Sequence, residues 1–493
     1  MTMTELAGAR GALYATHEDD EIASLDALAL SRAFSNRELS PVEVAGSLLG
    51  RIERLNPQVN AIVHLDREKT LEMARAAERR YISGNVLSPL DGVPVTVKDL
   101  SSIAGWPRRR GSLAFDGLSP CAEDTSCIAR LREAGAVFLG KTATPDSGCK
   151  VVTRSAVHGV TLNPYDLTKT PGGSSGGASA ALAMGFGALA VGSDGAGSIR
   201  IPASLTNVFG LKPGFGRVPA FPPDIDMPHS VVGPMSRSVH DAAVMLAVMS
   251  RPEPRDAFAW PVPFMVPDDL ADPDLRGLAV AFSPRMGCKA PLGDHEVDEL
   301  VARTIPLLAR AGAQALKEDL VWPVDPVEPF QIFWDTACAA TVDGFDATKQ
   351  CLLDPGILRA AEAGWKVSIS AYQHAMEQRL KMTAASRAFF NRFDLLVCPV
   401  VPTAAWSVER DVPEGFADHE WRWCPYTFPW NMTGQPAASV PIGFTTAGLP
   451  VGVQIVGPWG GEENVLRAAA AIERRRPPRK PRAAAARSSI SQP

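Results

Sequence analysis

PGGSSGGASAALAMGFGALAVGSDGAGSIRIP, residues 171–202, places two glycine-flanked serines, Ser174 and Ser198, on either side of an apolar run. Glycine permits backbone conformations with positive φ and lets a ligand approach the main chain closely. Loops of this kind can direct several N–H groups at one point, as an anionic intermediate requires. G-G-S-S-G-G alone is also typical of a flexible linker. Two such loops on either side of one packed helix–strand unit are harder to explain as linkers. We interpret them as parts of a catalytic site.

The apolar run between the two serines predicts a helix followed by a buried strand. Ser174 lies just before a small-residue helix expected from about Ala178, so N–H groups of its first turn point toward this serine. Residues 187–191 predict the strand, which delivers the Asp194–Ser198 loop at its C-terminal end. Open α/β sheets bind their ligands at such strand ends.

A serine hydroxyl is a poor nucleophile until a base takes its proton. None of the eight histidines lies within residues 171–202. A buried lysine is an alternative base, because desolvation disfavours the ammonium form. Lys98 is the penultimate residue of a segment, Gly92–Asp99, in which valines alternate with other residues as in a strand. A lysine at a strand exit is more commonly solvated, and the sequence alone does not bring Lys98 near Ser198.

Composition excludes several classes of protein. The chain has 493 residues, is 46% hydrophobic and 21% charged, and carries a net charge of −5, which gives no strong attraction to nucleic acid. Its eight cysteines include no C-x-x-C pair, so neither a zinc site nor a disulfide framework is predicted. The N-terminus lacks the pattern of a secretory signal, and no apolar run is long enough to span a membrane. We therefore expect a cytoplasmic protein without membrane contact.

The remaining segments predict structural helices and the boundaries of the domain. Ser40 precedes a helix with proline at its first position, expected to stop before Asn56, and another helix is expected over 297–311. Residues 318–430 hold seven of the ten tryptophans, which fits a core, an oligomer interface or the wall of an apolar pocket. The oligomer-interface interpretation would make the protein a homodimer. We predict a loose arm over 1–20, one domain over 21–473, and a basic, proline- and alanine-rich disordered tail over 474–493.

Six motifs in order give the chain its resemblance to the amidase signature family of serine amidohydrolases. They are GVPVTVKD at 92–99, GGSSGGASAA at 172–181, GSDGAGSIRIPA at 192–203, GLKPGFGRVP at 210–219, GPMSRSVHDAA at 233–243 and NMTGQPAASVP at 431–441. The resemblance extends from near residue 24 to about 473. It implies an α/β fold with a large, mixed, twisted central β-sheet flanked by helices on both faces.

The resemblance also implies a serine–cis-serine–lysine triad and no metal or other cofactor. By motif position, Ser198 is the nucleophile, Ser174 the bridging serine in a cis peptide, and Lys98 the base. The oxyanion hole would be formed by the N–H groups of Gly195, Ala196, Gly197 and Ser198. Gly148 and Ser175 would contact the substrate, and Ser175 is also the nearest rival for the bridging role. Asp194 and Arg200 would brace the loop.

Departures from the family pattern affect the expected substrate more than the mechanism. Ala196 stands where the family often has glycine, although its N–H survives. Pro145–Asp146 stands where many relatives have Pro-Glu, and Thr206–Asn207 replaces a smaller pair. We interpret these changes as tuning of the pocket.

The leading hypothesis is hydrolysis of a small-molecule carboxylic amide, and also of an ester or carbamate, through an acyl-enzyme. The tryptophan-rich region favours an apolar or aromatic substrate. One alternative is the glutaminase subunit of a tRNA-dependent amidotransferase. Another is a non-catalytic family member whose glycine loops bind an anion, although the intact Lys98, Ser174 and Ser198 argue against it.

Overall fold

The fold is organised around one large mixed β-sheet. The computed structural model describes residues 17–222, 229–287, 293–416 and 421–475. Within these ranges the sheet has 11 strands, as expected for the fold class. Its spatial order is β1 (Ile62–His64), β3 (Val137–Thr142), β2 (Pro94–Lys98), β6 (Leu189–Asp194), β8 (Val231–Ser236), β7 (Phe209–Lys212), β12 (Ala437–Phe444), β13 (Pro450–Val456), β11 (Leu395–Pro399), β9 (Ala279–Phe282) and β10 (Gln314–Lys317). The hairpin β4 (Arg154–Ser155) and β5 (Gly159–Val160) lies apart.

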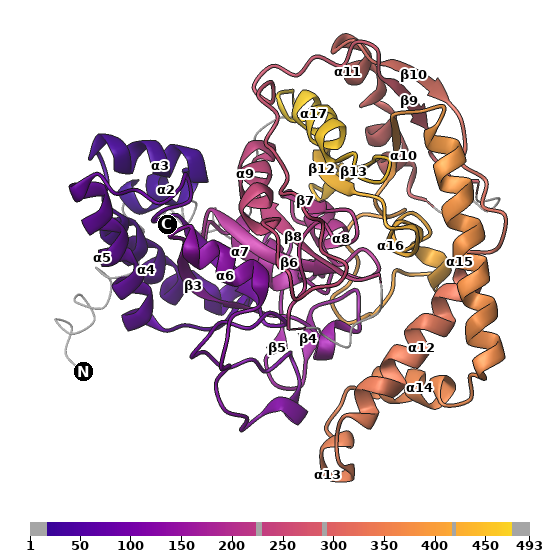
Figure 1. Cartoon of the computed structure of the whole chain (residues 1–493), viewed down its shortest axis with the longest axis horizontal. Coiled ribbons are helices and arrows are strands. Elements are labelled where there is room, and N and C mark those ends of the chain that lie inside the picture. The colour runs from indigo at the N-terminus through magenta and orange to yellow at the C-terminus, as the bar shows by residue number, and fades with distance from the viewer. Residues whose placement is uncertain (1–16, 223–228, 288–292, 417–420, 476–493) are drawn as a thin grey trace, which may run out of the picture.

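Helices cover both faces of the sheet and both of its ends. They are α2 (His17–Ser24), α3 (Ala27–Asn36), α4 (Pro41–Val59), α5 (Arg67–Ser83), α6 (Ser126–Glu133), α7 (Gly176–Ala183), α8 (Arg200–Leu205), α9 (Val239–Met249), α10 (His295–Ala302), α11 (Ile305–Arg310), α12 (Val327–Asp343), α13 (Ala347–Gln350), α14 (Pro355–Gly364), α15 (Ile369–Phe390), α16 (Pro429–Thr433) and α17 (Glu462–Glu473). Figure 1 shows α2 to α5 on one side of the molecule and α12 to α15 on the other, with the sheet between them.

Strand β13 shows how the two faces are filled. Val453 and Ile455 pack in the same buried cluster as the apolar side of α17. Gln454, which alternates with them, accepts a hydrogen bond from Arg200 of α8 at 2.8 Å. Successive side chains of a strand point to opposite faces. One face therefore packs on α17, and the other meets α8 beneath the glycine-serine loops.

Helix α4 begins as expected and ends later than expected. The Ser40 hydroxyl accepts a hydrogen bond from the N–H of Glu43, whose carboxylate accepts one from the N–H of Ser40. The prediction that the helix stops before Asn56 is wrong, because the helix continues through Pro57 to Val59. A proline in the last turn removes only one helical hydrogen bond. The helix ends at Asn60, which adopts the left-handed conformation with φ 49°.

The helix expected over 297–311 is two helices. Helix α10 ends at Ala302, and α11 starts at Ile305. Pro306 has no N–H to donate to the Ala302 carbonyl, so a continuous helix would lose that bond and clash there. The same proline fits the first turn of α11, where no such donor is needed.

The loose arm predicted over 1–20 and the disordered tail predicted over 474–493 stay predictions over most of their length. Residues 17–20, expected within the loose arm, form the start of α2. Residues 1–16 lie outside the described residues, and so do 476–493, which make up nearly all of the expected tail.

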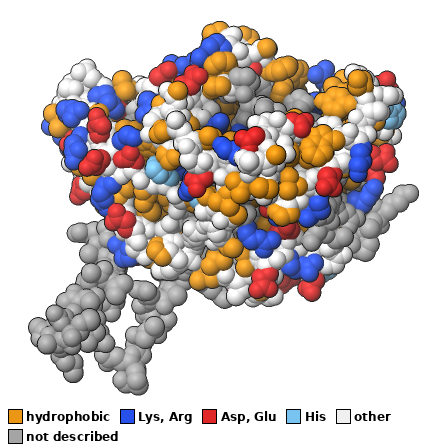
Figure 2. All heavy atoms as spheres, turned by 90° about the horizontal axis from the view of Figure 1, so that it is seen from below, with side chains coloured by type: hydrophobic (Ala, Val, Ile, Leu, Met, Phe, Trp, Pro, Cys, Tyr) orange, Lys and Arg blue, Asp and Glu red, His pale blue; other side chains and the backbone are white. Residues whose placement is uncertain are grey.

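Acidic and basic side chains intermingle on the face of the molecule shown in Figure 2, between scattered apolar ones. Among the helices that the structure describes, none combines the length and apolar character needed to cross a bilayer.

Candidate active site

The candidate site lies where two parallel strands end side by side. Strands β2 and β6 are parallel neighbours, with Val97 opposite Val191. Lys98 is the last residue of β2, and Ser193 and Asp194 are the last two of β6. Because the C-terminal ends of parallel strands meet at one edge of the sheet, Lys98 reaches the glycine-serine stretch. The sequence alone could not establish this proximity.

Lys98 is fully buried and holds two serine hydroxyls. Its Nζ donates to Ser174 Oγ at 2.7 Å and to Ser193 Oγ at 2.9 Å. Ser193 was not among the predicted site residues. Its position, one residue before the end of the strand paired with β2, was the available signal. The structure thus joins the predicted base to the predicted bridging serine.

Ser174 is held in place by a close backbone approach. The Gly173–Ser174 peptide bond is cis, the conformation that the family resemblance implies. A Cβ on Gly173 would lie 2.8 Å from the carbonyl carbon of Val152, so only glycine fits there. Helix α7 starts two residues after Ser174. Backbone packing therefore fixes the position of Ser174, and the hydrogen bond from Lys98 Nζ engages its hydroxyl.

Ser198 lines the same pocket as Ser174. The pocket has a volume of about 60 Å³, room for a few small groups such as a carboxamide. Ser198 is 7% exposed, and its hydroxyl donates to no acceptor among the residues that the structure describes. Its carbonyl accepts a hydrogen bond from the N–H of Ser175 at 3.1 Å. A buried backbone thus presents an accessible, unengaged hydroxyl.

The loop that carries Ser198 curls around the carboxylate of Asp194. Oδ1 accepts the N–H of Gly197 at 2.7 Å, and Oδ2 accepts the N–H of Ile199 at 3.1 Å. The N–H of Gly197 already has an intramolecular acceptor, so this geometry does not support its predicted place in the oxyanion hole. Within the described part of the chain, the N–H groups of Gly195, Ala196 and Ser198 have none, so these three stay available to a substrate oxygen.

Arg200 and Asn431 hold Asp194 from the other side. Arg200 Nη2 donates to Asp194 Oδ1 at 2.9 Å, and Asn431 Nδ2 donates to the same oxygen at 3.0 Å and to the Asp194 carbonyl at 2.8 Å. Burial opposes ionisation of this carboxyl, but the Arg200 guanidinium outweighs burial and holds the pKa of Asp194 well below its usual range. Asp194, Arg200 and Asn431, which we call the Asp194 clamp, join two motifs that are distant in sequence, 192–203 and 431–441.

Ser175 does not occupy the place that the sequence predicts. Its side chain is fully buried, donates to the Ser193 carbonyl at 3.2 Å and accepts the N–H of Ser193 at 3.3 Å. Ser175 does not line the pocket around Ser198, and Lys98 Nζ bonds Ser174 Oγ, so this geometry does not support the substrate contact or the rival bridging role, which stay predictions. Ser175 instead fastens the start of α7 to the end of β6.

Gly148 lines the pocket beside Ser174, as expected of a substrate contact. Its φ is +74°, and an added Cβ would lie 3.0 Å from Leu100 Cδ1 and 3.3 Å from Ser174 Oγ. A side chain at this position would crowd the bridging hydroxyl.

Asp146 ties the loop before Gly148 to its surroundings. Its carboxylate accepts hydrogen bonds from Ser112 Oγ at 2.8 Å, Ser147 Oγ at 2.9 Å and the N–H of Asp354 at 2.9 Å. Burial raises the pKa of Asp146 to about 6. Asp146 does not itself line the pocket, but it precedes Ser147 and Gly148, which do, so it can tune the pocket only by positioning them.

The other departure, Thr206–Asn207, lies elsewhere. Thr206 Oγ1 donates to the Pro202 carbonyl, and Asn207 Nδ2 donates to the Tyr165 hydroxyl. Neither residue lines the pocket around Ser198, so their interpretation as pocket tuning is wrong.

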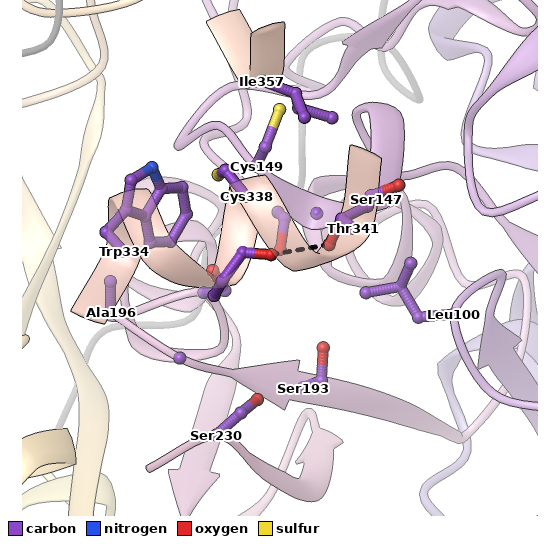
Figure 3. Close-up of a pocket in the computed structure, with 15 residues that line it drawn as sticks. Leu100, Ser147, Cys149, Ser193, Ala196, Ser230, Trp334, Cys338, Thr341 and Ile357 are labelled. Atoms are coloured by element: carbon purple, nitrogen blue, oxygen red, sulfur yellow. Dashed lines mark hydrogen bonds between the residues drawn. The ribbon is translucent and has the colours of Figure 1, made fainter. Parts of the chain in front are cut away.

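One face of α12 forms the wall opposite the strands. Trp334, Cys338 and Thr341 recur at helical spacing and face the pocket, and Ile357 of α14 lies beside them. Figure 3 shows Ser193 and Ser230 on the strand side and these residues across from them. Sequence reasoning missed them individually, because helical periodicity does not reveal which face of a helix meets a distant loop.

Two larger cavities adjoin the small pocket. One, of about 350 Å³, shares Leu100, Ser193 and Ser230 with it. The other, of about 280 Å³, shares Cys149 and Trp334. A reacting bond can sit at Ser198 while bulkier groups extend to either side.

Comparisons with known proteins agree on one enzyme family. A family model described as Amidase matches residues 43–466. An acylamidase from Rhodococcus erythropolis is 35% identical over 464 residues, which cover 91% of this chain and 95% of that protein. The A-type subunit of the glutamyl-tRNA(Gln) amidotransferase from Acidothermus cellulolyticus is 33% identical, with 91% and 93% covered. The crystal structure of a bacterial aryl acylamidase of the amidase signature enzymes superposes with a TM-score of 0.85 at 28% identity, covering 91% of this chain and 96% of that one.

Proposed function

This chain belongs to the amidase signature family, and on that premise we propose that it hydrolyses carboxylic amides through an acyl-enzyme on Ser198. It is an amidase, a hydrolase of C–N bonds in small-molecule amides. The observation that carries the proposed mechanism is the 2.7 Å hydrogen bond between Lys98 Nζ and Ser174 Oγ beside the pocket that holds Ser198.

In the first step, uncharged Lys98 takes the proton of Ser174 while Ser174 takes the proton of Ser198. Ser198 Oγ attacks the carbonyl carbon, and the negative charge moves onto the carbonyl oxygen. The N–H groups of Gly195, Ala196 and Ser198 stabilise that oxygen. Removing one such donor costs about 3–4 kcal/mol of transition-state stabilisation in characterised enzymes.

In the second step the proton returns through Ser174 to the departing nitrogen, and the C–N bond breaks. An amine leaves poorly unless it is protonated, so amides depend on this relay more than esters do. Water then attacks the acyl-enzyme, with the same groups accepting and returning its proton. An ester of the same acid gives the same acyl-enzyme, whereas a carbamate leaves an alkoxycarbonyl or carbamoyl group on Ser198 after its amine or alcohol departs; both are included in the proposed substrate range.

A second candidate is the glutaminase subunit of a tRNA-dependent amidotransferase. The 33% identity to the A-type subunit of a glutamyl-tRNA(Gln) amidotransferase favours it. That function predicts ammonia release from glutamine only in the presence of partner proteins. The 35% identity to an acylamidase favours action on acyl amides instead.

The test is a substrate panel of anilides, alkyl amides, esters, carbamates and glutamine, assayed with wild type and Ser198→Ala. We expect the isolated wild-type protein to hydrolyse at least one anilide or alkyl amide, and Ser198→Ala to lose that activity. The second candidate would be supported instead if glutamine were the one compound of the panel that is hydrolysed, and if its hydrolysis required partner proteins.

A further inference from the structure

The cavity on the Trp334 side of the active site contains a carboxylate without a cationic partner. This cavity measures about 280 Å³ and continues from the Ser198 pocket through Cys149 and Trp334. Its walls include three tryptophans, Trp334, Trp421 and Trp423, and the acid Asp335. Any substrate portion that extends from Ser198 past Trp334 enters this space.

Asp335 is buried beside Trp334 on α12. It is 8% exposed, and its Oδ1 accepts a hydrogen bond from Gln331 Nε2 at 2.7 Å. Among the described residues, no lysine, arginine or histidine lies within ion-pair distance of this carboxylate. Burial raises the pKa of Asp335, which reflects the cost of an unneutralised charge in this position.

The other acids around the cavity are neutralised. Lys150 Nζ lies 2.9 Å from Asp354 Oδ2 and 3.1 Å from Asp411 Oδ2. Arg154 Nη2 also contacts Asp411, at 2.5 Å. These two cations balance the two carboxylates. Asp335 is therefore the acid in this region with an oxygen left for a ligand.

Arg359 also lines the cavity but does not compensate Asp335. It is exposed, and it forms no ion pair with Asp335. Water and salt screen an exposed guanidinium, whereas a buried carboxylate acts through a low-dielectric medium. Asp335 therefore has no ion-pair partner among the described residues, and its carboxylate accepts the hydrogen bond from Gln331.

The tryptophans add a second reason to expect a cation. Trp334 and Trp421 pack edge to face with ring centroids 4.8 Å apart, and Trp423 packs on Trp406 at 5.2 Å. These contacts fix the rings in position. Tryptophan rings attract ammonium groups, most strongly where water is excluded.

The orientation of the scissile bond determines which half of a substrate reaches this cavity. The leaving nitrogen receives its proton through the Lys98 and Ser174 relay, and Lys98 also bonds Ser193. Ser193 lies across the pocket from Trp334 (Figure 3). Because Lys98, the base of the relay, contacts Ser193, the proposed binding mode places the leaving group toward Ser193 and the acyl group toward Trp334.

We propose that this cavity binds the acyl portion of the substrate and selects acyl groups that carry a protonated amine, which binds Asp335 among the tryptophans. This inference rests on the proposed function and narrows its substrate class. A charge-assisted hydrogen bond in such a site changes binding by roughly tenfold or more.

The test compares matched anilides of 4-(aminomethyl)benzoic acid and 4-ethylbenzoic acid, which differ in charge and little in shape. We expect wild type to show a kcat/KM at least tenfold higher for the aminomethyl compound. In Asp335→Asn, which keeps an acceptor for Gln331, kcat/KM for the aminomethyl compound should fall at least tenfold more than for the ethyl compound. Glu328→Gln, an exposed acid on the same helix, should keep the wild-type preference.

Equal rates for the two compounds in wild type, or equal losses in Asp335→Asn, would overturn the proposal. So would a preference that appears only when the aminomethyl group is on the aniline instead of the acyl half. Hydrolysis of the ethyl compound by wild type and not by Ser198→Ala tests the proposed function separately.

Discussion

Lys98 Nζ lies 2.7 Å from Ser174 Oγ, although 76 residues separate the two in sequence. The contact exists because β2 ends beside β6 and because Ser174 precedes α7 at the same edge of the sheet. It places a buried amine one hydroxyl away from the pocket that holds Ser198.

Replacing Lys98 with alanine should impair amide hydrolysis more than ester hydrolysis. We expect kcat on an anilide to fall by about 10²–10⁴-fold, the usual contribution of general acid–base catalysis. An ester with the same acyl group should lose less, because its leaving oxygen needs less protonation. The measurement is kcat for the matched pair, with Lys366→Ala, an exposed lysine, as the control. Equal losses on both substrates would contradict the relay.

Replacing Ser193 with alanine should lower kcat by about tenfold with little change in KM. The variant removes the 2.9 Å hydrogen bond that helps to orient Lys98. A hydrogen bond between uncharged groups is worth about 0.5–1.5 kcal/mol, and about 1.4 kcal/mol corresponds to a tenfold change in rate. Steady-state kinetics of Ser193→Ala, compared with the exposed Ser35→Ala, provide the check. An unchanged kcat would show that Ser174 alone positions the lysine.

Replacing Gly148 with alanine should lower kcat/KM by about tenfold or more. The new methyl would approach Ser174 Oγ and Leu100 in a backbone with φ +74°, and small displacements of reacting groups are costly. Gly46→Ala is the matched control, because a Cβ there would meet no atom within 4 Å in the middle of α4. That variant should keep full activity and gain up to about 1 kcal/mol of stability. Full activity in Gly148→Ala would refute the crowding argument.

Lys212 should make the stability depend on pH. Burial lowers its pKa to about 7, although its Nζ donates to the Pro213 carbonyl at 3.1 Å. Between pH 7 and about 10 the unfolded chain holds more protons at this residue than the folded protein does. The contribution of Lys212 to the free energy of unfolding therefore rises with pH, by up to about 1.4 kcal/mol per unit.

Denaturant unfolding of wild type and Lys212→Met at several pH values isolates that contribution. The stability of wild type relative to the variant should increase from pH 7 to pH 10. A difference that stays constant, or that falls, would mean that Lys212 is charged in the fold throughout this range.

Local sequence patterns predicted the elements that carry the site better than they predicted the contacts within it. The alternating valines before Lys98 and the small-residue run after Ser174 correspond to β2 and α7. The pairing of β2 with β6 joins segments about 95 residues apart, which no local pattern encodes. The family resemblance supplied that contact.

Within the site, the differences from the sequence-based expectations come from hydrogen bonds that the motifs do not encode, whether their partners are near or distant in sequence. The motif predicted four N–H donors for the oxyanion hole, but Asp194 takes that of Gly197. Ser175 carries the same hydroxyl as Ser174, yet its side chain bonds the backbone of Ser193. Asn431, 237 residues from Asp194, completes the Asp194 clamp and gave no local signal. The pocket wall from α12 likewise depends on how a distant helix packs.

The assignment of Ser198 as the nucleophile is tested most directly by the site of covalent modification. The protein is treated with a fluorophosphonate, and the modified peptide is located by mass spectrometry in wild type, Ser198→Ala and Ser175→Ala. We predict one adduct on Ser198, its absence in Ser198→Ala and its retention in Ser175→Ala. An adduct on Ser174 or Ser175, or equal labelling of wild type and Ser198→Ala, would contradict the account.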